Sequence, residues 1–170
     1  SVIDDFVAAF PDSYEGYISR AEYEAVMMRD FNAAEQSWNK AFKYAENPAE
    51  VHFGKAKAIN MIVLQGDTVS HPMLSLANVL CEVDKAITAD SLSLYINGKA
   101  EILSSHGHFA AAAECYESLA STDMRSPDIF AKASQCYRAV EDYEKSVAML
   151  DSAICCFDSV MVASYAPYIL

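Results

Sequence analysis

A short motif that recurs along the chain constrains its fold more than any other feature. The motif is a polar turn, an aromatic residue, two further residues and a small residue, and it occurs at Asp30–Ala34, Gly107–Ala112 and Glu141–Ser146. Ala112 and Ser146, the small residues of the last two copies, are 34 positions apart. A period in the thirties with two helices per unit is typical of a stacked helical array. Such arrays usually bind other proteins, so the motif favours a binding surface over a catalytic pocket.

The composition agrees with long helices. The chain has 170 residues, is 53% hydrophobic and contains only 5 Gly and 5 Pro. Few turn-forming residues leave little room for many short strands. No apolar run approaches the roughly 18 residues of a membrane span, so no membrane insertion is expected. The first residues, Ser1–Phe6, lack the basic start and apolar stretch of a signal peptide.

The charge balance limits the class of partner. The formal net charge is -12 and the sequence pI is near 4.6. An acidic surface repels phosphate backbones, so nucleic acid is not an expected partner. The charge favours solubility and suits basic partners, although a solvated acidic face is the simpler interpretation.

The cysteines indicate a reducing compartment. Their number is odd, no two form a CxxC pair, and all lie in helical patterns; they are Cys81, Cys115, Cys136, Cys155 and Cys156. Buried free cysteine behaves as a small hydrophobe. The adjacent Cys155 and Cys156 would point about 100° apart on a helix, which disfavours a redox pair. Free thiols favour the cytoplasm, and export stays open.

Apolar periodicity and capping residues predict nine helices arranged as one domain over residues 1–170. Ser126 and Pro127 form a clear helix start, and Ser70 or His71 is expected to cap a helix that begins at Pro72. The predicted helices cover residues 2–10, 14–28, 32–45, 49–64, 72–89, 93–105, 109–120, 127–140 and 143–157. The predicted repeats are residues 13–47, 48–90, 91–125 and 126–159.

The two ends of the chain suggest that repeats continue beyond it. Residues 164–169 echo residues 13–18, and each segment follows a second helix. We therefore expect residues 160–170 to start a further repeat or a capping helix, which a solenoid needs to cover its last apolar face. On the first interpretation, the chain is a segment of a longer array.

The repeats resemble the tetratricopeptide repeat family over about residues 13–158. The matching positions are Phe130, Ala133, Ser134, Tyr137, Asp142, Tyr143, Ser146 and Ala153 in the fourth unit; Gly107, Phe109, Ala112, Tyr116 and Leu119 in the third; Tyr17, Ala21, Phe31, Ala34, Trp38 and Ala41 in the first; and Gly66, Asp67 and Ala86 in the degenerate second. The resemblance implies an all-α, right-handed superhelix of antiparallel helix pairs. It also implies that peptides or helices bind on the concave face, which the first helix of each pair lines.

Polar and aromatic positions on the predicted first helices are the candidate partner-binding residues. They are Arg20, Tyr23, Lys57, Asn60, Asn97, Glu101, Gln135 and Arg138. The alternative for each is ordinary surface. Some members of this family clamp a terminal carboxylate with a set of Lys and Asn residues. Here only Asn97 and Lys132 match that set, so such a ligand is not expected.

No motif indicates catalysis, a metal or a cofactor. The chain contains no Walker-type loop, GxSxG or HExxH. His106 and His108 form the only close pair of histidines, and without nearby ligands they indicate a polar turn. The aromatic stripes and Trp38 follow helical spacing and are expected in the core.

The sequence thus predicts a non-catalytic scaffold that binds a protein or peptide, with no cofactor. Two alternatives stay open: the targeting module of a larger enzyme, or a homo-oligomer that forms through apolar ends. The apolar residues that would form the terminal contact are Val160, Met161, Val162, Tyr165, Tyr168, Ile169 and Leu170.

Overall fold

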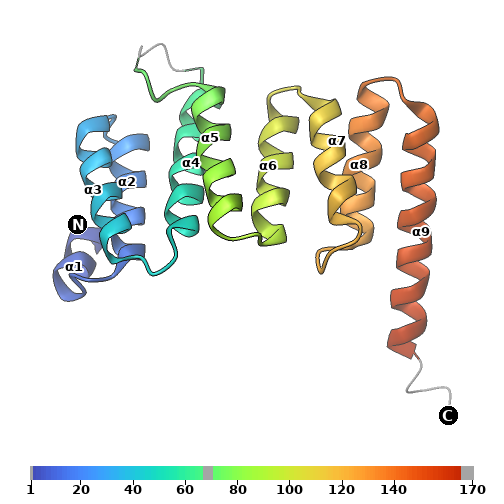
Figure 1. The fold of residues 1–170 in the computed structure, drawn as a ribbon, viewed down its shortest axis with the longest axis horizontal. Helices are drawn as coiled ribbons and strands as arrows, with labels where there is room; N and C mark the ends of the chain where they lie inside the picture. The colour runs from blue at the N-terminus through green and yellow to red at the C-terminus, as the bar shows by residue number, and fades with distance from the viewer. Residues whose placement is uncertain (1, 67–70, 166–170) are drawn as a thin grey trace. The chain divides into compact units, whose positions relative to one another are not determined.

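The computed structural model describes residues 2–66 and 71–165, with the side chains of the last helix described to residue 156. This part of the chain is all α-helical and contains no strand (Figure 1). Its nine helices are α1 (Val2–Ala9), α2 (Tyr14–Val26), α3 (Phe31–Tyr44), α4 (Pro48–Leu64), α5 (Leu76–Ala89), α6 (Ser93–Ser105), α7 (Phe109–Leu119), α8 (Pro127–Ala139) and α9 (Tyr143–Tyr165). The all-α prediction is therefore confirmed. The apolar residues predicted to form a terminal contact lie outside the described side chains.

Two predicted helix boundaries are wrong. Helix α5 begins at Leu76 instead of Pro72, because the Ser75 hydroxyl accepts a hydrogen bond from the Asn78 backbone N–H and caps the helix there. His71 belongs to the preceding turn, and Ser70 lies outside the described residues. Helix α9 continues beyond residue 157 to Tyr165, so residues 160–165 extend this helix instead of starting a new one.

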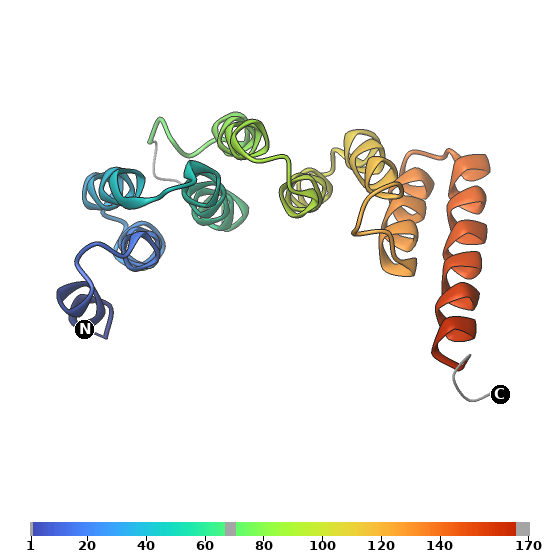
Figure 2. The same ribbon diagram turned by 60° about the horizontal axis from the view of Figure 1, so that its bottom comes forward.

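The chain divides into two compact units, Ser1–Tyr95 and Ile96–Leu170. In unit 1, helices α2 and α3 form one pair and α4 and α5 form the next, with α1 packed on α2. Figure 2 looks nearly along these helices and shows α2 and α4 on one side and α3 and α5 on the other. We call α2, α4, α6 and α8 the first helices and α3, α5, α7 and α9 the second helices.

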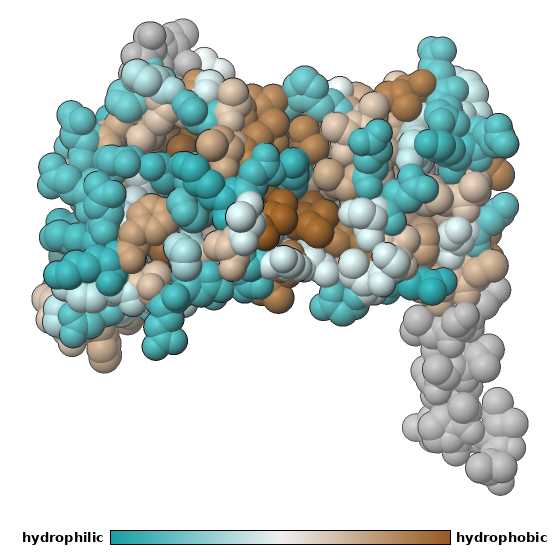
Figure 3. All heavy atoms as spheres, viewed as in Figure 1, coloured by the Kyte–Doolittle hydropathy of each residue, from teal (hydrophilic) through white to brown (hydrophobic). Residues whose placement is uncertain are grey.

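Small residues let the helices of each unit approach closely, as the motif predicted. Ala34 and Ala41 in unit 1, and Ala112 in unit 2, have no exposed surface. Trp38 is fully buried, so the prediction of a core tryptophan is confirmed. Hydrophilic residues cover most of the visible face of α2 and α3 (Figure 3). No helix among the described residues combines the length and apolarity required to cross a bilayer.

Each turn from a first to a second helix contains a residue with left-handed backbone. Gly66 and Gly107 have φ of 67° and 78°. Arg29 and Glu141 take the same conformation, with φ of 58° and 62°. Glycine adopts this region without strain, whereas a residue with a Cβ atom is disfavoured there. Two of the four turns are therefore built on residues that carry a conformational cost.

Candidate functional site

A hollow on the first-helix side of unit 1 is the leading candidate site. It has a volume of about 470 Å³ and lies between α2, α4 and the start of α6. We call it the unit 1 hollow; the residues used below are Glu15, Ile18, Glu50, Phe53, Gly54, Lys57, Leu94 and Tyr95.

The floor of the unit 1 hollow is apolar and closely packed. The rings of Phe53 and Tyr95 meet edge to face, with centroids 5.1 Å apart, beside the buried Ala49 and Ala86. Gly54 allows α2 and α4 to approach closely, because a Cβ atom at this position would lie 2.9 Å from Cγ2 of Ile18. The floor is thus formed before any ligand arrives.

Carboxylates dominate the polar groups of the unit 1 hollow. The Tyr14 hydroxyl donates a hydrogen bond to Glu50 over 2.5 Å, and this contact raises the pKa of Tyr14 to about 12. Backbone hydrogen bonding at Glu15 lowers the pKa of its carboxyl, and Ser13 adds to the shift. The Lys57 ammonium lies 5.3 Å from the centroid of the Phe53 ring. The hollow therefore offers two carboxylates beside an apolar floor, with one ammonium group at its edge.

Unit 2 has a second hollow, of about 360 Å³, between α6, α7 and α8. Lys132 crosses from α8 to Glu101 of α6 at 3.1 Å and also pairs with Asp128 at 3.1 Å. Burial raises the pKa of Tyr116 to about 12 and raises the pKa of the Cys136 thiol. A thiol with a raised pKa stays protonated, so Cys136 is not an activated nucleophile.

The predicted site residues divide into two groups. Lys57 lines the unit 1 hollow, and Glu101 and Gln135 line the unit 2 hollow. The other five, which neither hollow includes, are Arg20, Tyr23, Asn60, Asn97 and Arg138.

The side-chain contacts of Arg20 and Asn97 involve acidic residues. Arg20 pairs with Glu24 at 3.0 Å and with Asp4 at 3.6 Å. The Asn97 amide donates to Glu101 over 3.3 Å. Tyr23 and Arg138 are exposed and Asn60 is half-buried.

The prediction missed Glu15, Glu50, Phe53 and Leu94. One signal could have revealed part of this set: Glu50, Phe53, Gly54 and Lys57 follow the spacing of a single helix face, with a glycine inside the helix. Leu94 falls at the start of a helix, and its position follows only from how three segments meet.

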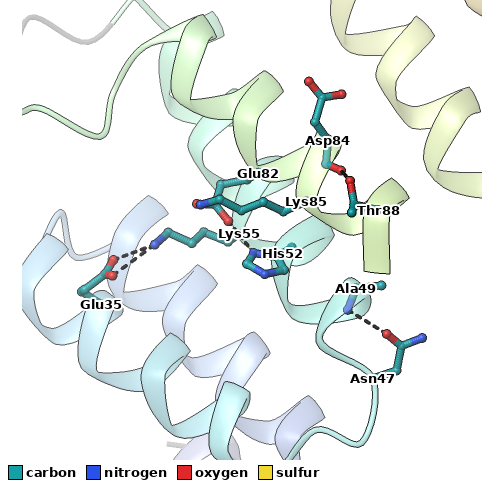
Figure 4. Close-up of polar contacts among 9 residues, drawn as sticks. All are labelled: Glu35, Asn47, Ala49, His52, Lys55, Glu82, Asp84, Lys85 and Thr88. Atoms are coloured by element: carbon teal, nitrogen blue, oxygen red, sulfur yellow. Dashed lines mark hydrogen bonds and ion pairs between the residues drawn. The ribbon is translucent and has the colours of Figure 1, made fainter. Parts of the chain in front are cut away.

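A charged network joins α3, α4 and α5 outside the hollow (Figure 4). Lys55 reaches from α4 to Glu35 of α3 at 2.9 Å. Glu82 of α5 accepts hydrogen bonds from His52 Nδ1 at 2.7 Å and from Lys85 at 2.8 Å. Burial of Glu82 raises the pKa of its carboxyl, but the hydrogen bonds from Lys85 and His52 outweigh burial and leave it below its ordinary value. These charges satisfy one another, which is typical of a structural network.

The possible metal ligands and the cysteines of the described residues are spread along the chain. Within them, no group of three or more His, Cys, Asp or Glu side chains is placed to hold a metal ion. None of the five cysteines, all of which lie within the described residues, forms a disulfide. Cys155 is exposed while its neighbour Cys156 is buried, as two adjacent helical residues are expected to be.

In comparisons with known proteins, the chain matches no protein-family model and no curated protein. The resemblance to the tetratricopeptide repeat therefore stays a prediction from the residues themselves.

Proposed function

We propose that this chain is a non-catalytic protein-interaction module of the tetratricopeptide type. Its helix pairs would continue one another as a right-handed superhelix, with the first helices on the binding side. The ligand would be an extended peptide or a helix of another protein. The support is the repeat spacing, the antiparallel pairs within each unit and the hollows that the first helices line.

The unit 1 hollow is the observation that carries this proposal. Its apolar floor suits one apolar side chain, and Glu15 and Glu50 suit a Lys or Arg nearby in the ligand. Because the floor is already packed, little ordering is required on binding. We therefore expect the preferred ligand to contain a basic residue close to an apolar one.

A display experiment tests this proposal. The full chain is used to select binders from a random 12-residue phage-displayed peptide library, and the enriched peptides are titrated by calorimetry. The expected result is enrichment of peptides that carry Lys or Arg next to an apolar residue. No enrichment, or enrichment of acidic peptides, would contradict the proposal.

Variants then locate the site. The double variant Glu15→Gln/Glu50→Gln should weaken binding about tenfold, which corresponds to about 1.4 kcal/mol. Leu94→Ala should also weaken it, because Leu94 is 53% exposed and borders the hollow. Glu46→Gln is the matched control, since Glu46 is exposed just beyond α3 and does not line the hollow. If Glu46→Gln weakened peptide binding as much as the hollow variants do, the loss would reflect overall charge and not a site in the hollow.

A further inference from the structure

The charged groups of the unit 1 hollow are separated along its length. Glu15 lies in the first turn of α2 and Glu50 in the first turn of α4, and the Tyr14 hydroxyl joins these two helix starts. Both carboxylates therefore lie at one end of the hollow. Lys57 comes seven residues after Glu50, which places it about 10 Å further along the same face of α4. Phe53 lies between them, so the hollow has an acidic end, an apolar middle and a basic end.

The ammonium group at the basic end is available to a ligand. Lys57 is exposed and makes no ion pair with a residue that the structure describes. Its ammonium contacts a neutral group instead, the ring of Phe53. Lys55, two residues earlier on α4, pairs with Glu35 at 2.9 Å and is already neutralised. The hollow therefore presents a positive charge that a carboxylate of the ligand can pair with.

The size of the hollow favours an extended ligand over a helix. A helix with its side chains is about 10 Å wide, so a 10 Å length of helix fills on the order of 800 Å³. The hollow has a volume of about 470 Å³. In an extended segment, alternate side chains point to the same face and are about 6.7 Å apart, so three of them span about 13 Å. This span matches the distance from Glu50 to Lys57 once the length of the lysine side chain is added.

We propose that the unit 1 hollow binds an extended segment with a basic, an apolar and an acidic residue at alternate positions, and that Lys57 selects the acidic one. This inference rests on the proposed function and names the ligand of the same site. The basic residue would pair with Glu15 and Glu50, the apolar residue would pack on Phe53, and the acidic residue would pair with Lys57. A second basic residue in the last position would meet the Lys57 ammonium and be rejected.

Two synthetic peptides test this inference against the full chain. Both are 12-residue peptides of Ser and Gly with capped ends; the mixed-charge peptide has the central sequence Lys-Ser-Leu-Ser-Glu and the dibasic peptide has Lys-Ser-Leu-Ser-Lys. Fluorescence anisotropy is measured at about 0.15 M salt, which screens the general attraction of an acidic chain for the dibasic peptide. The unaltered chain should bind the mixed-charge peptide about fivefold more tightly. In Lys57→Glu the order of the two affinities should reverse.

Lys40→Glu is the matched control for the reversal. Lys40 is an exposed lysine of α3 whose ammonium also lies beside an aromatic ring, 5.5 Å from the centroid of Tyr17, and it does not line the hollow. The substitution changes the net charge as much as Lys57→Glu does, but it should keep the preference for the mixed-charge peptide. Circular dichroism melts confirm that both variants are folded, as expected for exposed positions.

Three results would overturn this inference. If the unaltered chain bound the dibasic peptide as tightly as the mixed-charge peptide or more tightly, Lys57 would not select an acidic residue, while the proposed function would stand. If Lys40→Glu reversed the preference as Lys57→Glu does, the preference would reflect overall charge and not a contact in the hollow. If neither peptide bound, the basic and apolar contacts of the proposed function would be contradicted as well.

Discussion

Unit 1 and unit 2 join the helices of their pairs through different polar groups. In unit 1, Glu24 of α2 is 8% exposed and accepts hydrogen bonds from Ser37 of α3 at 2.6 Å and from Arg20 at 3.0 Å. The second pair of unit 1 is joined by Glu82 and His52. In unit 2, α8 and α9 are joined by two neutral hydroxyls, those of Ser134 and Ser146. Similar helix pairs can thus be closed by an ionised or a neutral contact.

This difference predicts how the stability of each helix pair depends on pH. A buried carboxylate stabilises the fold only while it is ionised and paired, and it is costly when its partner is lost. A pair of hydroxyls keeps the same hydrogen bond across the ordinary pH range. The helix pairs of unit 1 should therefore be more sensitive to acid than the α8–α9 pair, and four sets of substitutions test the comparison from the largest effect to the smallest.

The largest effect is expected from Glu24→Ala. The substitution leaves the buried Ser37 hydroxyl without its acceptor and removes a charge-assisted contact to Arg20, so it should cost about 2–3 kcal/mol of unfolding free energy. Trp38 is the only tryptophan and is buried in unit 1, so its fluorescence during urea unfolding measures the loss. Glu22→Ala, an exposed position on the same helix, should change stability by less than about 0.5 kcal/mol. If Glu24→Ala and Glu22→Ala lowered the free energy of unfolding equally, the structural role assigned to Glu24 would be wrong.

The second largest loss of stability is expected from enlarging a buried alanine, a feature that both units share. Ala34 and Ala112 are fully buried where helices cross, so Ala34→Leu and Ala112→Leu should each cost about 1–3 kcal/mol by overpacking. Thermal unfolding followed by circular dichroism measures both variants. Unchanged melting curves in both would show that close helix approach does not depend on these residues.

A smaller and pH-dependent effect is expected from Glu82→Gln. At pH 7 the loss of the charge-assisted contacts to Lys85 and His52 should cost about 1–2 kcal/mol. Because the pKa of folded Glu82 is below its ordinary value of 4.5, the unfolded chain binds more protons as the pH falls below 4.5. The stabilisation from Glu82 is therefore complete above about pH 4.5 and is lost at lower pH.

The free energies of unfolding of the unaltered chain and of Glu82→Gln should accordingly converge as the pH falls below 4.5. Urea unfolding followed by Trp38 fluorescence at several pH values measures the convergence. A difference that stays constant down to pH 3 would contradict the role assigned to the charge. Glu46→Gln serves as the control, because Glu46 is exposed.

The smallest effects are expected in unit 2. Ser134→Ala leaves the Ser146 hydroxyl buried without its partner and should cost about 1 kcal/mol. Removing both hydroxyls in Ser134→Ala/Ser146→Ala should restore stability to nearly its original value, since no buried polar group is then left unpaired. Hydrogen exchange resolved to α8 and α9 measures the change in this unit. A double variant that is much less stable than the single one would contradict the neutral-contact interpretation.

The sequence predicted those parts of the fold that depend on local pattern. Apolar spacing predicted every helix of the described chain, and Ala34 and Ala112, the small residues expected at helix contacts, are fully buried. The start of α5 was missed because Pro72 and Ser75 both suit a helix start, and the backbone between them forms turns before the helix begins. Glycine marked two of the four left-handed turn positions, while Arg29 and Glu141 gave no sequence signal for the other two.

The candidate site was only partly predictable because it depends on contacts between segments. Lys57, Glu101 and Gln135, which were predicted from their place on the first helices, line the two hollows. Arg20 was also predicted, but a neighbouring acid one turn away engages it. The buried carboxylates were missed as well, because Glu24 and Glu82 look like surface residues until their partners on neighbouring elements are known.

The most direct test of the account is a methyl NMR titration of the full chain with a display-selected peptide. We predict that the methyl signals of Ile18 and Leu94 shift on binding, because both residues line the unit 1 hollow, while those of Leu150 and Ile154 on α9 stay in place. Shifts at Leu150 and Ile154 without any at Ile18 and Leu94 would contradict binding at the first-helix face.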